Sequence, residues 1–201
     1  VLVIDDDPTW LALIREWLAR LHRPSVAVTC ADSYTSGLDR LLGGTFDACI
    51  VDYRLDRTGT GLDLLKAARH EGHEVPMLLL TAEGEGELDV TALRSGAADF
   101  LGKEGLNAEL TGRAVRYAIE RFRALQALRE SESRYRSVFE HAPYGIAGSY
   151  DNRLTTVNPA LVQMLGYPSA EALMNIDIGR DLFVDPAEFA AALVGADEDD
   201  G

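Results

Sequence analysis

Four short apolar runs, separated by longer segments with helical spacing, constrain the fold of this chain more than any other feature. Each run leads into polar residues suited to metal or phosphate chemistry: residues 1–4 into Asp5, Asp6 and Asp7, 48–51 into Asp52, 77–80 into Thr81, and 98–101 towards Lys103. Short apolar runs of this kind are typical of buried parallel strands. Because ligands bind at the carboxyl ends of such strands, we expect these side chains to share one crevice.

The segments between the runs predict the rest of the fold. Asp7 followed by Pro8 is typical of a helix start, and apolar residues continue at helical spacing to Leu21. Further segments are expected as a strand over 25–29, a helix over 33–42, a helix after the glycine-rich residues 58–61, a helix over 88–95 and a long helix from about Asn107. Five strand–helix units with right-handed crossovers predict a doubly wound α/β fold with a five-stranded parallel sheet.

The charge balance narrows the classes of partner. Acidic residues outnumber basic ones 33 to 19, which gives a formal net charge of −14 and argues against nucleic-acid binding. No apolar stretch is long enough for a membrane span, and no signal peptide precedes the first strand, so we expect no membrane partner. Cys30 and Cys49 lie in or beside apolar runs, as core residues in a reducing compartment would, which predicts a cytoplasmic protein. The chain does not begin with Met and is expected to be part of a longer protein.

The motifs VLVIDDDP, VDYRL, LLLTA and DFLGK, in this order, resemble those of the receiver domain of two-component response regulators. The resemblance covers residues 1–123 and implies a flavodoxin-like sheet of strand order 2-1-3-4-5. It also implies a role for each motif residue: Asp52 as the phosphoacceptor; Asp5, Asp6, Asp52 and the backbone carbonyl of Arg54 as Mg²⁺ ligands; Thr81, Ala82 and Lys103 as contacts of the phosphoryl group; and Thr81 with Phe100 as the switch residues.

The resemblance implies two-component signal transduction. A histidine kinase or phosphotransfer protein would be the partner that donates the phosphoryl group, and the domain would be a regulatory phosphoacceptor with slow autodephosphorylation rather than an enzyme. The chain departs from the family at two places. Glu104 stands where a proline usually follows the lysine, and the segment after Asp52 is about one residue longer than usual.

Two alternatives remain open at this point. Residues 5–9 also fit the DxDxT opening of haloacid-dehalogenase-type phosphatases, with Asp5 as nucleophile and Asp7 as general acid. However, no later strand ends in the further acidic motif of those phosphatases, and Asp52 would have no role. The third interpretation is a degenerate receiver that acts only as a dimerisation scaffold.

The second half of the chain has a different organisation. The helical pattern from Asn107 continues past the receiver, and residues 124–136 are expected to form a connector. Its apolar spacing is compatible with a two-stranded coiled coil, which predicts a homodimer through this helix, although a solvated linker helix also fits.

Residues 131–194 resemble the start of a PAS sensor domain. The expected elements are an initial helix, two strands joined at Asp151-Asn152, a helix from Asn158-Pro159 and a short helix from Ser169. We expect the PAS domain to occupy 137–201 as a truncated α+β fold, because the three strands that complete its sheet are not in the sequence. No ligand is assigned to it, and it is expected to receive the signal through the connector.

Overall fold

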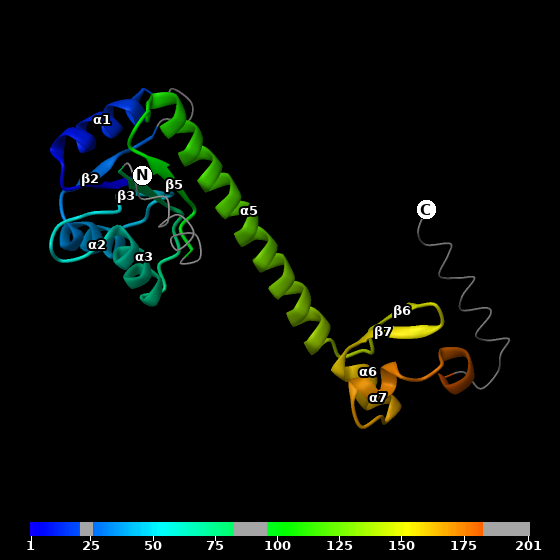
Figure 1. Cartoon of the computed structure of the whole chain (residues 1–201). Helices are drawn as coiled ribbons and strands as arrows, with labels where there is room; N and C mark the ends of the chain where they lie inside the picture. The colour runs from blue at the N-terminus through cyan, green and yellow to red at the C-terminus, as the bar shows by residue number, and fades with distance from the viewer. Residues whose placement is uncertain (21–25, 83–95, 183–201) are drawn as a thin grey trace. The chain divides into compact units, whose positions relative to one another are not determined.

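The structure is a computed structural model that describes residues 1–20, 26–82 and 96–182 (Figure 1). The predicted helix over 88–95 lies outside the described residues. The chain divides into two compact units, Val1–Ala127 and Leu128–Gly201.

The first unit contains the predicted parallel sheet. Its described strands are β1 (Leu2–Ile4), β2 (Thr29–Ala31), β3 (Cys49–Asp52), β4 (Met77–Thr81) and β5 (Asp99–Gly102), in the order β2-β1-β3-β4-β5. Val3 pairs with Ile50, and Ile50 with Leu78, so the buried runs lie side by side across the centre of the sheet. The predicted doubly wound fold and its strand order are therefore confirmed.

The predicted bounds of the second strand were wrong. Residues 25–29 were expected, whereas β2 runs from Thr29 to Ala31, where Thr29 pairs with Leu2 and Ala31 with Ile4. β2 is an edge strand and only Ala31 in it is fully buried. Its limits follow from pairing with β1 rather than from its own apolar pattern. Val26 and Val28 still pack on the core although they lie outside the strand.

Helices cover both faces of the sheet (Figure 1). α1 (Pro8–Ala19) and the start of α5 (Ala108–His141) pack on the face that carries Val3, Ile50 and Leu78. α2 (Tyr34–Gly43) and α3 (Gly61–His70) pack on the opposite face. Because successive side chains of a strand point to opposite faces, each central strand supplies both hydrophobic layers.

The start of α3 lies directly against the end of β3. Thr60 caps the helix in a reciprocal pair with Asp63, in which each backbone N–H donates to the other residue's side chain at 3.1 Å. The Gly61 N–H donates to the carbonyl of Tyr53 at 2.9 Å. A Cβ at position 61 would lie 2.4 Å from the carbonyl oxygen of Asp52, so only glycine permits this approach.

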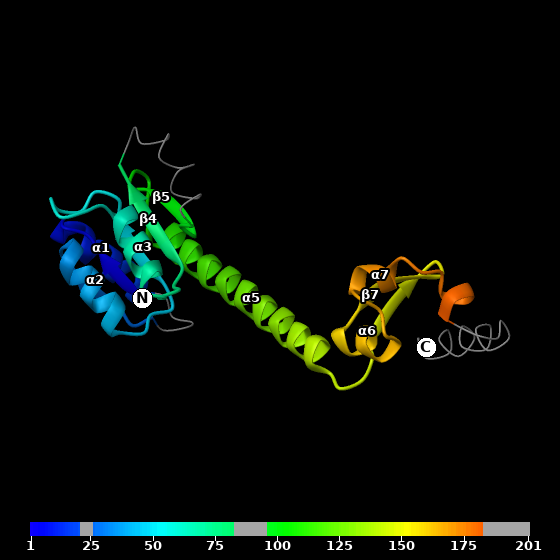
Figure 2. The ribbon, with the colours of Figure 1, turned by 90° about the horizontal axis from the view of Figure 1, so that it is seen from below.

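The second unit begins within α5, which is continuous in both ribbon views (Figure 1, Figure 2). The predicted hairpin is confirmed as β6 (Ala147–Tyr150) and β7 (Arg153–Val157), and Asp151 and Asn152 both have positive φ, as a tight hairpin turn requires. It is followed by α6 (Pro159–Leu165), α7 (Ala170–Met174) and a π-helical turn over Ile178–Leu182. Among the described residues, no helix has both the length and the apolar content that crossing a membrane requires.

Asn158 joins the segment after α5 to the hairpin and α6. Its side-chain oxygen accepts hydrogen bonds from the N–H groups of Ile146 (2.8 Å) and Leu161 (3.0 Å), and its amide donates to the carbonyl of Tyr144 (2.9 Å). The side chain is fully buried with both of its polar atoms paired, so it orders this region at no cost in unsatisfied polar groups.

We expect Gly61→Ala to lower the free energy of unfolding of the first unit by about 1–3 kcal/mol, because the new methyl group forces α3 away from β3. Both tryptophans of the chain, Trp10 and Trp17, lie in α1, so urea unfolding followed by tryptophan fluorescence reports on this unit. Gly43→Ala is the control, since a Cβ there would have open space in a helix. An equal loss in both variants would contradict the close packing.

Candidate functional site

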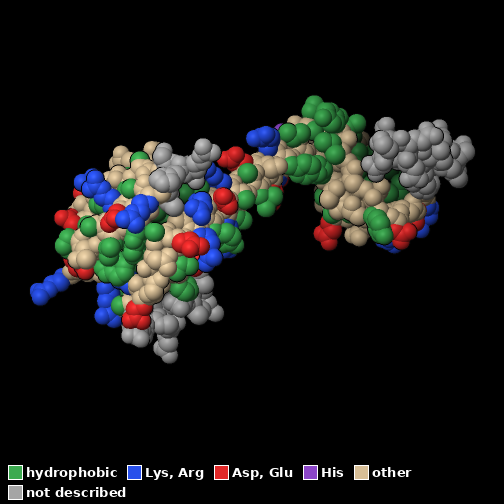
Figure 3. Space-filling view, turned by 90° about the horizontal axis from the view of Figure 1, so that it is seen from above, with side chains coloured by type: hydrophobic (Ala, Val, Ile, Leu, Met, Phe, Trp, Pro, Cys, Tyr) green, Lys and Arg blue, Asp and Glu red, His purple; other side chains and the backbone are tan. Residues whose placement is uncertain are grey.

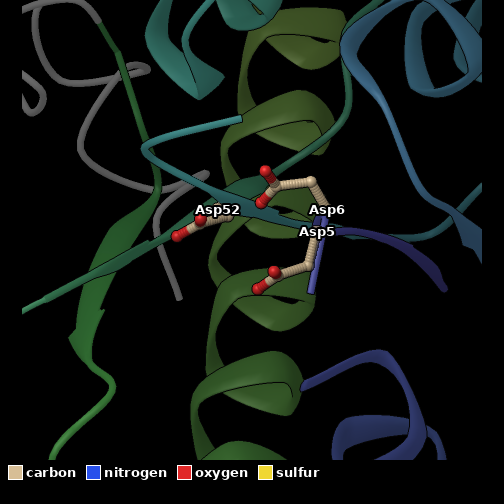
Figure 4. A group of neighbouring side chains, drawn as sticks. All are labelled: Asp5, Asp6 and Asp52. Carbon is tan, nitrogen blue, oxygen red and sulfur yellow. The ribbon is translucent and has the colours of Figure 1, made fainter. Parts of the chain in front are cut away.

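The carboxyl ends of two neighbouring strands, β1 and β3, bring three carboxylates together. Asp5 and Asp6 follow β1, and Asp52 is the last residue of β3. One carboxylate oxygen of each lies within 4.8 Å of the others, and Figure 4 shows the three side chains extending into a common region. We call Asp5, Asp6 and Asp52 the acidic cluster.

Asp5 is completely buried, and its two oxygens have different surroundings. Oδ1 accepts a hydrogen bond of 2.9 Å from the Asp7 N–H. Oδ2 receives no hydrogen bond of suitable geometry from any described residue, although the Lys103 ammonium lies 2.8 Å away as an ion pair. A buried carboxylate oxygen with spare acceptor capacity, beside two further carboxylates, is a ligand set that suits a hard divalent cation. The residues present therefore fit a Mg²⁺ ion.

Lys103 supplies the positive charge of the site. Its Nζ also lies 3.1 Å from Asp52 Oδ1, and it is positioned over the Trp10 ring at 5.2 Å from the centroid. Its backbone N–H donates to the carbonyl of Thr81 at 2.8 Å, which ties it to the end of β4. Burial by itself lowers the pKa of this ammonium, but the contacts with Asp5 and Asp52 outweigh it and raise the pKa above its usual value.

Asp52 is the carboxylate whose ionisation the fold opposes. Burial, reinforced by repulsion from Asp5, raises its pKa from the usual 3.8 to about 6, even though Lys103 acts in the opposite direction. At neutral pH the group is ionised yet poorly solvated. A cation added to the crevice would therefore stabilise the ionised form of Asp52.

The remaining predicted residues differ in burial and in the element that carries them. Thr81 is buried at the end of β4, and Ala82, which follows it, is exposed. Arg54 is exposed and forms an isolated β-bridge with Thr60, which closes the loop after Asp52. Phe100 is half-buried on β5 and, with Leu110 and Tyr117 of α5, lines a cavity of about 410 Å³.

Two residues near the site were not identified from the sequence. Trp10, which lies four residues after Asp6 in the first turn of α1, was assigned only to the apolar pattern of its helix. Asp56 anchors the lengthened loop, since its carboxylate accepts hydrogen bonds from the N–H groups of Tyr34 (3.0 Å) and Thr58 (2.7 Å). The Asp-x-Thr spacing of Asp56 and Thr58 is a local turn signal that could have indicated this anchor.

Comparison with known proteins agrees with this geometry. The family model of the response regulator receiver domain matches residues 1–114, which is more than half of the chain, and a PAS domain model matches residues 133–199. The chain belongs to the response regulator receiver family. The predicted order of a receiver followed by a PAS domain is thereby confirmed.

The relatives of this receiver include two curated bacterial regulators and a solved receiver domain. The response regulator protein PilR of Pseudomonas aeruginosa is 34% identical over 119 residues, which are 57% of this chain and 26% of PilR. The transcriptional regulatory protein FixJ of Bradyrhizobium diazoefficiens is 34% identical over 112 residues, which are 55% of this chain and 52% of FixJ. A receiver domain protein from Clostridium thermocellum has a TM-score of 0.55 at 28% identity and covers 62% of this chain and 96% of its own. The chain thus spans about a quarter to a half of the length of these curated relatives.

We expect Asp52→Asn, studied without divalent cations, to raise the free energy of unfolding of the receiver by about 1–2 kcal/mol near neutral pH. The pKa of Asp52 in the folded state, about 6, exceeds the usual 3.8, so the fold favours the protonated form. This contribution to the stability of the folded state is complete below the unfolded pKa and is lost as pH rises through 6. The gain of the variant should therefore shrink as pH falls towards about 4. Urea unfolding at several pH values measures it.

Asp7→Asn is the control for this experiment. Hydrogen bonds from the backbone and side chain of Thr9 lower the pKa of Asp7, so this carboxylate is favoured in the fold at neutral pH. Its substitution should not stabilise the receiver there. A similar gain in both variants would show that net charge, rather than burial at position 52, is responsible.

Proposed function

We propose that the receiver accepts a phosphoryl group on Asp52 from a histidine kinase or a phosphotransfer protein. The observation that carries this proposal is the position of the buried Asp52 carboxylate, at the strand ends between two further acids and an ammonium 3.1 Å away. An Asp52 oxygen forms the new bond to phosphorus, while the phosphohistidine nitrogen of the donor leaves with the electron pair of the broken bond. The resulting acyl phosphate is later hydrolysed slowly by water, so the domain acts as a regulatory phosphoacceptor and not as an enzyme.

Asp5, Asp6 and Asp52, with the backbone carbonyl of Arg54, are the proposed ligands of Mg²⁺, which when bound neutralises the repulsion between Asp52 and the incoming phosphoryl group. Lys103 provides a second positive charge, held beside Asp52, for the phosphoryl oxygens. The Thr81 hydroxyl donates to another of these oxygens, and the small side chain of Ala82 leaves access to Asp52. These groups stabilise charge on the transferring phosphoryl group.

The proposed output of phosphorylation is a change at Thr81 and Phe100. β4 and β5 are paired at Leu79 and Phe100 and at Thr81 and Gly102, so a shift at Thr81 acts on the strand that carries Phe100. Phe100 shares its cavity with residues of α5, and α5 continues from the first unit into the second. We therefore propose a population shift that α5 relays to the PAS domain, which acts as an interaction module.

For domain limits we propose 1–123, 124–136 and 137–201 for receiver, connector and PAS domain.

The proposed partners are proteins in the cytoplasm. The free thiols of Cys30 and Cys49 are compatible with a reducing compartment. The net charge of −14 disfavours direct contact with nucleic acid, so proteins are the expected binding partners.

Acetyl phosphate with Mg²⁺ tests the phosphoacceptor directly. We expect the wild type to form an adduct, detected by intact mass and phosphate-affinity gel, that hydroxylamine removes because it is an acyl phosphate. Asp52→Asn should form none, and removal of Mg²⁺ with EDTA should suppress the wild-type reaction. Asp39→Asn, which changes an exposed aspartate of α2 outside the acidic cluster, should leave the adduct unchanged.

Two results would contradict the proposal. If Asp5→Asn abolishes both adduct and turnover while Asp52→Asn keeps them, the phosphatase interpretation is correct. If a folded wild type forms no adduct at all, the domain is a scaffold.

We also propose that α5 pairs with the same helix of a second copy. Six of the ten exposed large hydrophobic residues in the described part of the chain lie on α5: Leu110, Tyr117, Leu125, Leu128, Tyr135 and Val138. Hydrophobic side chains also reach the surface in the space-filling view (Figure 3). Leu110, Tyr117, Leu128 and Tyr135 follow one another at steps of seven, eleven and seven residues, which places them on one side of the helix. Two identical helices in parallel would bury each of these residues against its own copy.

Leu128→Glu should shift the protein towards the monomer, because it places two like charges in the proposed seam. Sedimentation equilibrium or light scattering over a concentration series measures the shift, which we expect to be tenfold or more in the dissociation constant, on the order of 1.4 kcal/mol. Ser133→Glu is the matched control, as the same charge lies about 140° away around the helix. If both variants associate with themselves as strongly as the wild type does, the proposed seam is contradicted.

A further inference from the structure

We propose that Trp10 is a positioning residue for Lys103, an inference that rests on the proposed phosphoacceptor function. The ring centroid of Trp10 lies 5.2 Å from Lys103 Nζ, within the range in which an ammonium is attracted to an aromatic face. The ammonium therefore has three contacts, with Asp5 at 2.8 Å, Asp52 at 3.1 Å and the indole ring. Only 15% of the Lys103 side chain is exposed, so little water competes with the ring.

The position of the Trp10 ring is set by α1 and not by the charges of the crevice. Asp7 caps α1 by accepting a hydrogen bond of 2.8 Å from the Thr9 N–H, which fixes the first turn. Ile14 and Leu18 bury the helix against the sheet, and Trp10 packs on the same hydrophobic cluster. The Trp17 ring meets Trp10 edge to face, at 6.4 Å between centroids and an interplanar angle of 76°. The indole ring is thus held in a fixed position by the packing of α1.

A fixed aromatic ring matters for Lys103 because the loop that carries this residue does little to fix the position of its side chain. Glu104 follows it in place of the proline of the family, and the chain then turns through Gly105 at a φ of 71°. The Lys103 N–H bond to Thr81 orients the backbone, but the four-carbon side chain beyond it is intrinsically flexible. The indole face restricts the ammonium to the side of Asp5 and Asp52. In this position it is ready to meet the phosphoryl oxygens, so Trp10 acts on the transfer through Lys103.

Nuclear magnetic resonance tests this contact without any phosphorylation. Lys66 and Lys103 are the two lysines of the chain, so lysine labelled with ¹³C gives two sets of side-chain signals, and Lys66 on α3 is an internal reference. We expect the ring current of Trp10 to shift the Lys103 ε-methylene protons upfield. The shift should disappear in Trp10→Leu and persist in part in Trp10→Phe, which keeps an aromatic face. An unchanged Lys103 signal in folded Trp10→Leu would overturn the proposal.

The rate of phosphorylation by acetyl phosphate then tests the functional consequence. Trp10→Leu should slow the reaction roughly two- to thirtyfold, the range of a cation–π contact, whereas Trp10→Phe should recover most of the rate. Leu11→Ala removes a side chain of the same helix that packs on the same hydrophobic cluster, and it controls for lost packing in α1. In a Lys103→Met background, Trp10→Leu should have no further effect, because the residue through which it acts is already absent.

The outcomes separate this proposal from the proposed function. If the wild type forms no adduct but the ring-current shift is present, the phosphoacceptor function fails while the contact stands. If the wild type forms the adduct on Asp52 and Trp10→Leu reacts at the wild-type rate, or slows equally with and without Lys103, Trp10 has no positioning role.

Discussion

Two buried carboxylates share one ammonium at the carboxyl edge of the sheet, and the organisation of the receiver depends on this arrangement. Asp5 and Asp52 come from neighbouring strands, and Lys103 reaches both at 2.8 and 3.1 Å. Without the lysine, two poorly solvated anions would face each other, which is costly in an interior of low dielectric constant. With it, the site is stable but retains an excess of negative charge, since the acidic cluster holds three carboxylates and Lys103 supplies one positive charge. That excess is what suits the site to a divalent metal ion.

The backbone around the site is arranged to hold these charges close together. β1 and β3 pair in register, so that the residues after Ile4 and Val51 reach the same level of the sheet. Gly61 lets α3 begin against the carbonyl of Asp52, and Asp56 ties the following loop to the start of α2. These contacts are made by backbone groups and short polar side chains, which leave little freedom for Asp52 to move away from Lys103. The result is a preorganised site in which the proposed chemistry requires little rearrangement.

α5 combines two patterns that serve different purposes. Thr111, Gly112, Val115 and Ala118 are buried, and Val115 and Ala118 pack on the hydrophobic cluster of the sheet, which fixes the helix to the receiver. The exposed apolar residues on another side extend beyond the point where the first unit ends. A solvated linker would not be expected to keep large hydrophobic residues at such regular steps. The helix therefore belongs to the receiver through its buried residues, and its exposed apolar residues are the basis of the proposed pairing with a second copy.

The sequence by itself determined the parts of this protein that follow from local periodicity. The apolar runs, the helix starts at Asp7 and Asn158 and the hairpin at Asp151-Asn152 are short-range signals, so the doubly wound fold, the strand order by resemblance and the candidate residues Asp5, Asp6, Asp52 and Lys103 were accessible from it. Only the tertiary structure decided which residues of the second strand pair with β1, because an edge strand takes its limits from its neighbour. It also decided that Lys103 bridges Asp5 and Asp52 beneath the Trp10 ring, and that Asp56 anchors the longer loop to Tyr34. These contacts join residues that are distant along the chain, and their distances depend on the packing of whole helices against the sheet, which no local pattern encodes.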